Sequence, residues 1–479
     1  MPGSPVASSW DGWASLPLLV AAVLIGLAVA GAVLWLGRGL IVDRLTDRTV
    51  RRLLREPYRE NLWDLAVGIH RIPPALLLEL ELRADKGELL ERPLGGLSRF
   101  SPWEAIAFNP AQLARPPLPP GAPVDTQVVL GPRAGRPLRL ATPLLVSAMG
   151  YGIGVSKAFA LALARGAHRA GTAYNAGSGP VLPEILESEG PVILQYTGGA
   201  WNQIPEELAR AAMVEIRLGH GARSALGRLI KVDRLPAEAR HRMGAGTRDH
   251  LVIDAPLPET LDARAFRGLV ERLRRLTGGA PVGVKLVATH DLERDLLYVL
   301  DAGVDVIALD GSEGGTTETP PTLADDFGIP TLYALVRAAA LLEAAGLRDQ
   351  VSLIVGGGIR TPGEALKALA LGADAVYLGT AVMMAATHGQ LSKPLPFEPI
   401  TQLVWATGRL AGRFDPGEGA RTVAQFLRAC TLEMAEAARA LGRERLSAID
   451  RTDLVARTPA AARILGLPPA WRPPGRRTW

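Results

Sequence analysis

One lysine stands inside an apolar stretch, "PVGVKLVA", at residues 281–288. The chain has only six lysines among its 53 Lys and Arg residues, so lysine is seldom used here to supply a surface charge. A buried ammonium is costly unless it meets an anion, and its compact charge differs from the planar fork of arginine. We therefore predict that Lys285 is catalytic and faces an anionic partner. The alternative is a lysine that extends from the strand end to solvent.

Two further stretches end in glycine, "VSLIVGGG" at 351–358 and "AVYLGT" at 375–380. Glycine at a strand exit lets the backbone approach a ligand closely. The helix expected at "PGEALKALALG" would offer unpaired N–H groups to a phosphate. Two tight turns are the plainer alternative. The residues predicted to bind a cofactor phosphate are Gly356, Gly357, Gly358, Gly379 and Thr380.

Strands and helices are expected to alternate after a proline-rich linker, "ARPPLPPGAP". Short, continuously apolar strands are typical of a parallel sheet covered on both faces. Eight such units predict an α/β fold, a closed (β/α)8 TIM barrel, in which the loops after strands seven and eight often bind phosphate. The expected strands are 143–149, 171–175, 192–196, 213–218, 281–287, 305–310, 351–356 and 374–379.

Small or polar residues follow the apolar run of every expected strand, which marks one end of the barrel as a candidate site. Ser147, Ala148, Met149, Asn175 and Gln195 are predicted to contact the cofactor. In "GHGARSALG", His220 and Arg223 are predicted to clamp a substrate carboxylate, although a solvated loop fits them equally. In "DGSEGGT", the residues predicted to hold a carboxylate or a ring edge are Asp310, Glu313, Gly314 and Gly315, against the alternative of helix capping.

Composition narrows the possible functions. The chain has 479 residues, 48% of them hydrophobic, which suffices for one barrel with additions. Its single cysteine, Cys430, excludes a disulfide framework, a thiolate zinc site and a self-ligated iron–sulfur cluster. Cys430 lies in an amphipathic helix and is expected to pack. The net charge of +5 is modest and no basic block lies among aromatic residues, so no nucleic-acid partner is expected. No metal site is expected either.

Residues 12–37 carry no charged side chain, and this stretch is long enough for a membrane-spanning helix. Arginines follow this stretch and none precedes it, so the barrel is expected in the cytoplasm, on a single-pass anchor in the inner membrane. A cleaved signal peptide is the alternative. The predicted domains are a transmembrane anchor at 1–37, a helical region with the linker at 38–120, the barrel at 121–456 and a tail at 457–479.

Together these motifs resemble the FMN-binding synthase barrel of glutamate synthase, in its stand-alone, membrane-anchored form. The resemblance runs from about Thr142 to Leu454 and rests on "SAMGYG", "NAGSG", "EIRLGHGARSALG", "VGVKLV", "DGSEGGT" and "LGRERLSAIDRTDL". It implies an FMN cofactor whose reduced form delivers hydride to 2-iminoglutarate, made from 2-oxoglutarate and ammonia. The anionic reduced flavin would then be the partner of Lys285.

The chain also departs from that family's pattern. The family usually has glutamate at Ser178, glycine at Pro180, glutamine at His220 and lysine at Arg223. The cysteines of the family's iron–sulfur cluster are absent from "MMAATHGQLSKPLPFEPI", so no cluster is expected. The chain does not begin with the nucleophilic cysteine of a glutaminase domain, so ammonia would have a separate source. Electrons would come from a partner protein, a nicotinamide cofactor or the membrane.

Three functions stay open on this basis. The first is a glutamate-synthase-type oxidoreductase acting on an amino or keto acid. The second is an FMN barrel dehydrogenase or isomerase with another substrate. The third is a membrane-bound flavin-binding protein that has lost synthase activity. The presence of Lys285 and "DGSEGGT" favours the first two.

Overall fold

A computed structural model describes residues 16–57, 63–72, 74–88, 102–316 and 327–473. The chain divides into two compact units, at 1–64 and 65–479. The first contains α1 (Leu16–Arg55), a helix of 40 residues. Among the described residues, no helix is both long and apolar enough to pass through a bilayer. The predicted anchor at 1–37 is therefore unsupported, and its first 15 residues lie outside the described chain.

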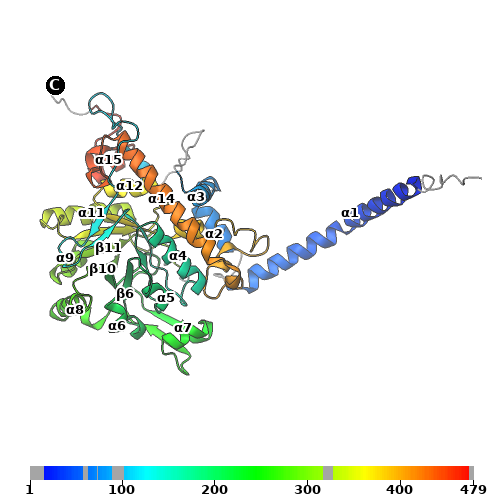
Figure 1. Cartoon of the computed structure of the whole chain (residues 1–479), viewed down its shortest axis with the longest axis horizontal. Coiled ribbons are helices and arrows are strands. Elements are labelled where there is room, and N and C mark those ends of the chain that lie inside the picture. Colours follow the sequence, from blue (N-terminus) through cyan, green and yellow to red (C-terminus); the bar gives the residue numbers. More distant parts are fainter. Residues whose placement is uncertain (1–15, 58–62, 73, 89–101, 317–326, 474–479) are drawn as a thin grey trace, which may run out of the picture. The chain divides into compact units, whose positions relative to one another are not determined.

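The second unit is built around a closed barrel of eight parallel strands, which confirms the predicted (β/α)8 fold (Figure 1). The strands follow one another around the barrel in chain order, so each pairs with its neighbour in sequence. Most are one to three residues shorter than expected. They are β4 (Leu144–Val146), β5 (Tyr174–Asn175), β6 (Val192–Tyr196), β7 (Met213–Arg217), β10 (Val282–Val287), β11 (Val306–Asp310), β12 (Ser352–Gly356) and β13 (Ala375–Leu378).

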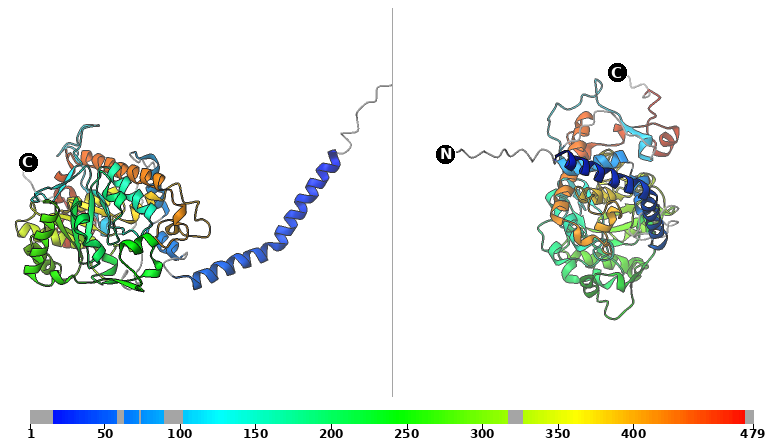
Figure 2. Two further views of the ribbon diagram at one scale, coloured as in Figure 1. Left: turned by 60° about the horizontal axis from the view of Figure 1, so that its bottom comes forward. Right: turned by 90° about the vertical axis from the view of Figure 1, so that its right-hand side faces the viewer.

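Helices surround the strands, as both views of Figure 2 show. All but the longest follow a strand in the chain, as the alternation of strand and helix requires. The long α14 (Pro416–Ala440) packs across α4. The other helices around the barrel are α4 (Lys157–Arg169), α5 (Pro183–Leu186), α6 (Pro205–Leu208), α8 (Ala263–Leu276), α9 (Leu292–Asp301), α11 (Thr331–Ala344), α12 (Pro362–Ala370) and α13 (Thr380–Ala386).

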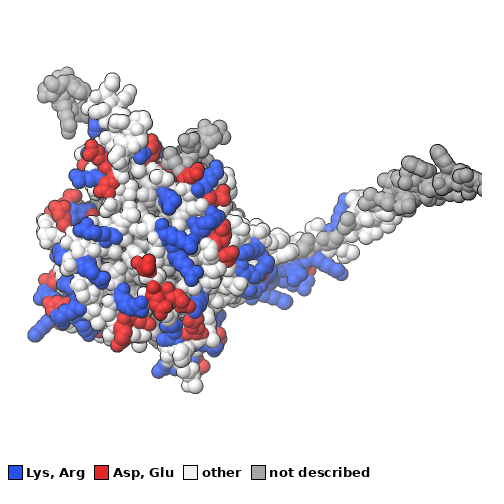
Figure 3. All heavy atoms as spheres, in the orientation of Figure 1, with Lys and Arg blue, Asp and Glu red and all other residues white. Residues whose placement is uncertain are grey.

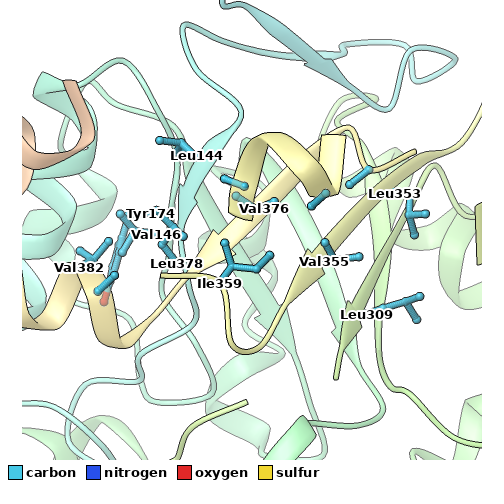
Figure 4. Close-up of a cluster of buried hydrophobic side chains, with 14 of the residues drawn as sticks. Leu144, Val146, Tyr174, Leu309, Leu353, Val355, Ile359, Val376, Leu378 and Val382 are labelled. Atoms are coloured by element: carbon cyan, nitrogen blue, oxygen red, sulfur yellow. The ribbon is translucent and has the colours of Figure 1, made fainter. Parts of the chain in front are cut away.

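Two apolar clusters follow from the alternation of side chains along each strand. Figure 4 shows part of the outer one, in which Leu144, Val146, Val376 and Leu378 lie between the strands and the helices, near Val382 of α13. The residues between them face the barrel axis instead. Inward-facing positions are therefore where the strands can bring side chains from different parts of the chain together.

A hairpin of β2 (Val128–Leu130) and β3 (Leu138–Leu140) fills the N-terminal end of the barrel. Its leucines form one cluster with inward-facing strand residues such as Leu145 and Ile354. Arg136 holds the hairpin by donating to the carbonyl oxygens of residues 211 and 277, each at 3.1 Å, just before two strands begin. This end of the barrel is packed apolar core, so chemistry belongs at the other end.

The long fourth connection carries an antiparallel pair, β8 (Arg228–Lys231) and β9 (His250–Ile253), with α7 (Ala237–Arg242) between them. The stretch "HLVIDAP" in this connection contributes β9. On the face shown in Figure 3, basic and acidic side chains are interspersed over the second unit. The remaining elements are α2 (Trp63–Arg71), α3 (Pro74–Lys86), β1 (Ile106–Phe108), which pairs with β14 (Leu454–Ala456), and α15 (Pro459–Leu465).

Candidate functional site

Lys285 faces the barrel axis from β10 and is almost fully buried. Its Nζ lies 3.1 Å from Oδ2 of Asp310 on the neighbouring strand and 5.0 Å from the centre of the Tyr377 ring. Burial alone would raise the pKa of Asp310, but the Lys285 ammonium holds it below its ordinary value. The anion that this lysine was expected to require is therefore supplied by the protein itself.

A buried carboxylate that the predicted site did not include lies at the centre of this region. Glu215 of β7 is fully buried, and its Oε2 accepts a hydrogen bond of 2.8 Å from the Tyr377 hydroxyl. Its Oε1 accepts from the amide nitrogens of Asn175, at 2.9 Å, and Gln195, at 2.8 Å. Four strands thus contribute to one polar network. Burial and the neighbouring Glu215 raise the pKa of Tyr377 well above its ordinary value, so its hydroxyl stays protonated.

Basic groups on β7 and the loop after it lie beside the ion pair. His220 Nε2 is 4.0 Å from Oδ2 of Asp310, and its Nδ1 is buried without a partner among the described residues. Burial, opposed by the attraction of Asp310 and aided by repulsion from Lys285 and nearby arginines, lowers the pKa of His220 to about 3, so its imidazole is neutral. Burial lowers the pKa of Arg217 to about 10, helped by repulsion from Arg223.

Arg217 is a second residue absent from the predicted site. Its guanidinium makes no hydrogen bond or ion pair within 4.0 Å to any other residue that the structure describes. The only signal in the sequence is its place, two residues after Glu215 in "MVEIRL". Alternation puts both side chains on the same face of β7. A half-buried cation without a hydrogen-bonded partner among the described residues is a candidate for binding an anionic ligand.

The glycines after β12 and β13 come together as predicted. Gly357 and Gly358 adopt positive φ of 103° and 71°, which favours glycine. Among the described residues, the N–H groups of Gly357, Gly358, Gly379 and Thr380 find no hydrogen-bond acceptor. A Cβ at Gly379 would meet only the Cβ of Ser147, 3.9 Å away. The backbone therefore presents four donors, with open space beside Gly379, whereas a Cβ at Gly357 would lie 2.8 Å from Thr331 Oγ1 and one at Gly358 2.9 Å from Glu313 Cβ.

The helix that follows this loop behaves differently from expectation. Thr361 and Glu364 form a capping box at the start of α12, in which the Thr361 side chain accepts from the Glu364 N–H. The Glu364 carboxylate accepts from the N–H groups of Arg360, at 2.7 Å, and Thr361, at 3.2 Å. This helix end already holds a carboxylate, so it is not free for a phosphate. The expectation for its N-terminus was wrong.

The loop after β11 divides the residues predicted in "DGSEGGT". Oε2 of Glu313 accepts from the backbone N–H of Thr331, at 2.9 Å, and from its hydroxyl, at 3.0 Å, so this carboxylate caps α11. That is the alternative considered for this motif. The backbone of Gly314 lies against Gly357, and Gly315 is near Thr380. The glycine part of the loop therefore borders the four free donors.

The first loop borders the same place. The Ser147 N–H donates to the carbonyl oxygen of residue 378, which continues the pairing of β4 with β13. The Tyr174 hydroxyl donates to the carbonyl oxygen of Met149 at 3.1 Å. Ala148 lies between these two contacts. Across the mouth, Ser224 adopts φ 52° and ψ −145° while its carbonyl oxygen accepts from the His220 N–H. Such strain in a non-glycine residue is typical of functional sites.

Residues 124–444 match the family described as the conserved region in glutamate synthase. The chain belongs to the glutamate synthase family. The archaeal-type glutamate synthase [NADPH] of Thermotoga neapolitana is 29% identical over 402 residues, which cover 79% of this chain and 78% of that protein. The glutamate synthase large subunit-like protein of Rhizobium meliloti is 29% identical over 431 residues, covering 83% of this chain and 94% of that protein.

Solved structures match this chain at lower similarity. A mandelate oxidase variant with an FMN adduct is 20% identical, with a TM-score of 0.47, over 81% of this chain and 97% of its own. A chimeric (S)-mandelate dehydrogenase is 15% identical, with a TM-score of 0.49, over 80% of this chain and 99% of its own. At such scores these likenesses add nothing to the assignment. The glutamate synthase family match spans every strand of the barrel and thus all the site residues described above.

Proposed function

We propose that this member of the glutamate synthase family is an FMN-dependent oxidoreductase that reduces an imino acid such as 2-iminoglutarate. Bound flavin would supply the hydride transfer. The observation that carries the proposal is the convergence, at the C-terminal end of the barrel, of four unpartnered backbone donors with the buried network around Lys285 and Glu215. Both groups of residues lie within the matched family region.

The four free N–H groups fit a phosphate. Those of Gly357 and Gly358 follow β12, and those of Gly379 and Thr380 follow the adjacent β13. Backbone donors that converge in this way form a concave anion site without needing a basic side chain. In the proposal they hold the FMN phosphate, while the capped start of α12 takes no part.

The polar network fits the ring of the cofactor. Gln195 has a side-chain N–H and a carbonyl oxygen without a partner among the described residues. Lys285 provides a positive charge near the barrel axis, but Asp310 neutralises part of it. In the proposal Lys285 still favours an anionic ring nearby, with a weaker effect than an unpaired ammonium would have.

The basic residues at the end of β7 and in the loop after it fit an oxo or imino acid. Arg217 and Arg223 can bind carboxylates through two parallel N–H groups each. Neutral His220 can donate one hydrogen bond without adding charge. In the proposal these three residues hold the carboxylates of the substrate over the flavin. Because two arginines are present, an acid with two carboxylates would be favoured over an acid with one.

The second candidate is an FMN oxidoreductase of the same type with a different acid substrate. It is favoured by the replacements at His220 and Arg223, which lie in the loop assigned to the substrate, and at Ser178. The backbone carbonyl of Ser178 accepts a hydrogen bond of 2.9 Å from the Trp201 indole, so this position is fixed beside Trp201.

Two measurements test the proposal. The full chain purified without added flavin should be yellow, with bound FMN released on denaturation. After anaerobic reduction, 2-oxoglutarate plus ammonium should reoxidise the flavin, whereas 2-oxoglutarate alone should not. Reoxidation by another oxo acid with ammonium, but not by 2-oxoglutarate, would select the second candidate. A colourless protein that takes up no FMN would refute all the flavin-based functions.

A further inference from the structure

Glu215 has a feature that its place in a flavin site does not by itself explain. All three of its hydrogen-bond donors come from neutral side chains on other strands: Asn175 on β5, Gln195 on β6 and Tyr377 on β13. A carboxylate can only accept hydrogen bonds. Each amide must therefore turn its nitrogen, and not its oxygen, toward Glu215. The orientation of both amides is imposed by one buried acid.

The consequences for the two amides differ. Asn175 uses both of its N–H groups, one to Glu215 and one to the Tyr377 hydroxyl at 3.1 Å, and its oxygen accepts from the Gly177 N–H at 3.0 Å. It has no donor left for a ligand. Gln195 uses one N–H on Glu215 and keeps the other, together with its carbonyl oxygen, without a partner among the described residues. Only Gln195 presents a free amide edge.

We propose that Glu215 is a positioning residue that fixes the Gln195 amide in one of its two orientations, so that its oxygen and its second N–H meet a ring edge with complementary groups. The chemistry that fits is an N–H beside a carbonyl, as on the imide edge of the flavin ring. This inference rests on the proposed function. It also changes the role of Asn175, which supports Glu215 and has no side-chain N–H left to donate to the cofactor.

The Tyr377 hydroxyl completes the arrangement. It donates to Oε2 of Glu215 while it accepts from Asn175, so the carboxylate is held through both oxygens. Without Glu215 the Gln195 amide could rotate by half a turn, which exchanges its acceptor and its donor. A ring edge would then face two mismatched groups, and each unpaired buried polar group costs binding free energy.

A double-mutant cycle separates positioning from a purely structural role. Glu215→Met and Glu215→Gln are made in the wild-type chain and in a Gln195→Ala chain, and FMN dissociation is measured by equilibrium dialysis of the purified full-length protein. In the wild-type background we expect Glu215→Met to weaken FMN binding about tenfold, with Glu215→Gln in between, because the glutamine keeps one acceptor. In the Gln195→Ala background both changes should weaken binding less than twofold.

A buried carboxylate at the opposite end of the barrel provides the matched control. Asp305 accepts hydrogen bonds from Arg274, at 2.9 Å, and from the N–H of Val282, at 3.0 Å. Asp305→Asn should lower the melting temperature and leave FMN affinity within twofold. If Glu215→Met does not fold, Glu215→Gln and Tyr377→Phe carry the same cycle with smaller expected losses.

The outcomes are distinguishable. If the Glu215 changes weaken FMN binding equally with and without Gln195, the positioning role is overturned and the proposed function stands. If they leave FMN binding unchanged in both backgrounds, the positioning role is likewise overturned. If the wild-type chain binds no FMN, the proposed function and this inference fail together.

Discussion

Removing both members of the buried ion pair should destabilise the barrel by less than the sum of the losses from removing each alone. Lys285 and Asp310 lie 3.1 Å apart, with side chains 1% and 7% exposed. At an effective dielectric constant of about 20, the attraction over this distance is roughly 5 kcal/mol before desolvation is subtracted. Lys285→Met or Asp310→Asn alone leaves one buried charge uncompensated, which should cost about 3–5 kcal/mol of unfolding free energy. The double variant should recover about 1–3 kcal/mol of the summed loss.

Urea unfolding of the four proteins, followed by circular dichroism, gives the coupling free energy directly. The matched control is the exposed pair Arg267–Asp301, which has the shorter distance of 2.8 Å but side chains 51% and 59% exposed. Its coupling should be at most about 0.5 kcal/mol. If the losses of Lys285→Met and Asp310→Asn simply add, the two residues do not interact in the folded protein and the reasoning is refuted.

The same variants should shift the potential of a bound flavin in opposite directions. Lys285→Met removes a positive charge and should make the potential more negative, whereas Asp310→Asn removes a negative charge and should raise it. A differential interaction of ~1 kcal/mol corresponds to roughly 20 mV for a two-electron couple. Lys285→Arg should restore the potential only in part, because its charge is spread over a planar group. Equal potentials in all three variants would place Lys285 away from the ring.

Three shorter predictions concern the loops. Gly358→Leu should abolish FMN retention while the barrel stays folded, because the Cβ of the new leucine would lie 2.9 Å from the Cβ of Glu313. The control is Gly346→Leu, at a position with a similar φ where a Cβ would meet no atom within 4 Å, and this variant should keep its FMN. Between pH 6.5 and 5 His220 becomes protonated in the unfolded chain but not in the folded one, whose His220 pKa is about 3, so the free energy of unfolding decreases as the pH is lowered. His220→Gln should remove about 2 kcal/mol of that decrease. Identical pH profiles of the two proteins by calorimetry would contradict this prediction. Ser224→Gly should raise the melting temperature by a few degrees, since relief of about 1–3 kcal/mol of strain exceeds the entropy cost of glycine, and an unchanged melting temperature would show that φ 52° is not strained.

The barrel could be predicted from the sequence because its strands are apolar on both faces and alternate regularly with helices. The meeting of Asn175, Gln195, Lys285 and Asp310 also followed from that pattern, since equivalent ends of parallel strands lie side by side. Pairing between these residues did not follow. Lys285 was predicted to face a ligand because the sequence does not give the register between β10 and β11. Only this register shows that Asp310 lies close enough to pair with Lys285.

The place of Glu215 at the end of the fourth strand could be recognised in the sequence, but its role and that of Tyr377 could not be assigned, for a related reason. Each lies within an apolar run, where a single polar residue is equally compatible with an inward or an outward position. Only the pairing of β7 with β6 and of β13 with β12 fixes the side on which they lie. The role of Glu313 could not be predicted for a different reason. It is 18 residues from Thr331 in the sequence, and no periodic pattern connects the two, so only the tertiary fold shows that Glu313 caps α11.

The hairpin of β2 and β3 has a consequence for kinetics. Because its leucines fill the N-terminal end of the barrel, no molecule the size of a substrate can pass along the barrel axis. In the proposed reaction the electron source and the oxo acid would therefore approach the flavin from the same side. If the donor is a nicotinamide that lies over the ring, it must leave before the acceptor can take its place. The order of events that this geometry imposes is alternation between two half-reactions, with parallel lines in double-reciprocal plots when donor and acceptor are varied.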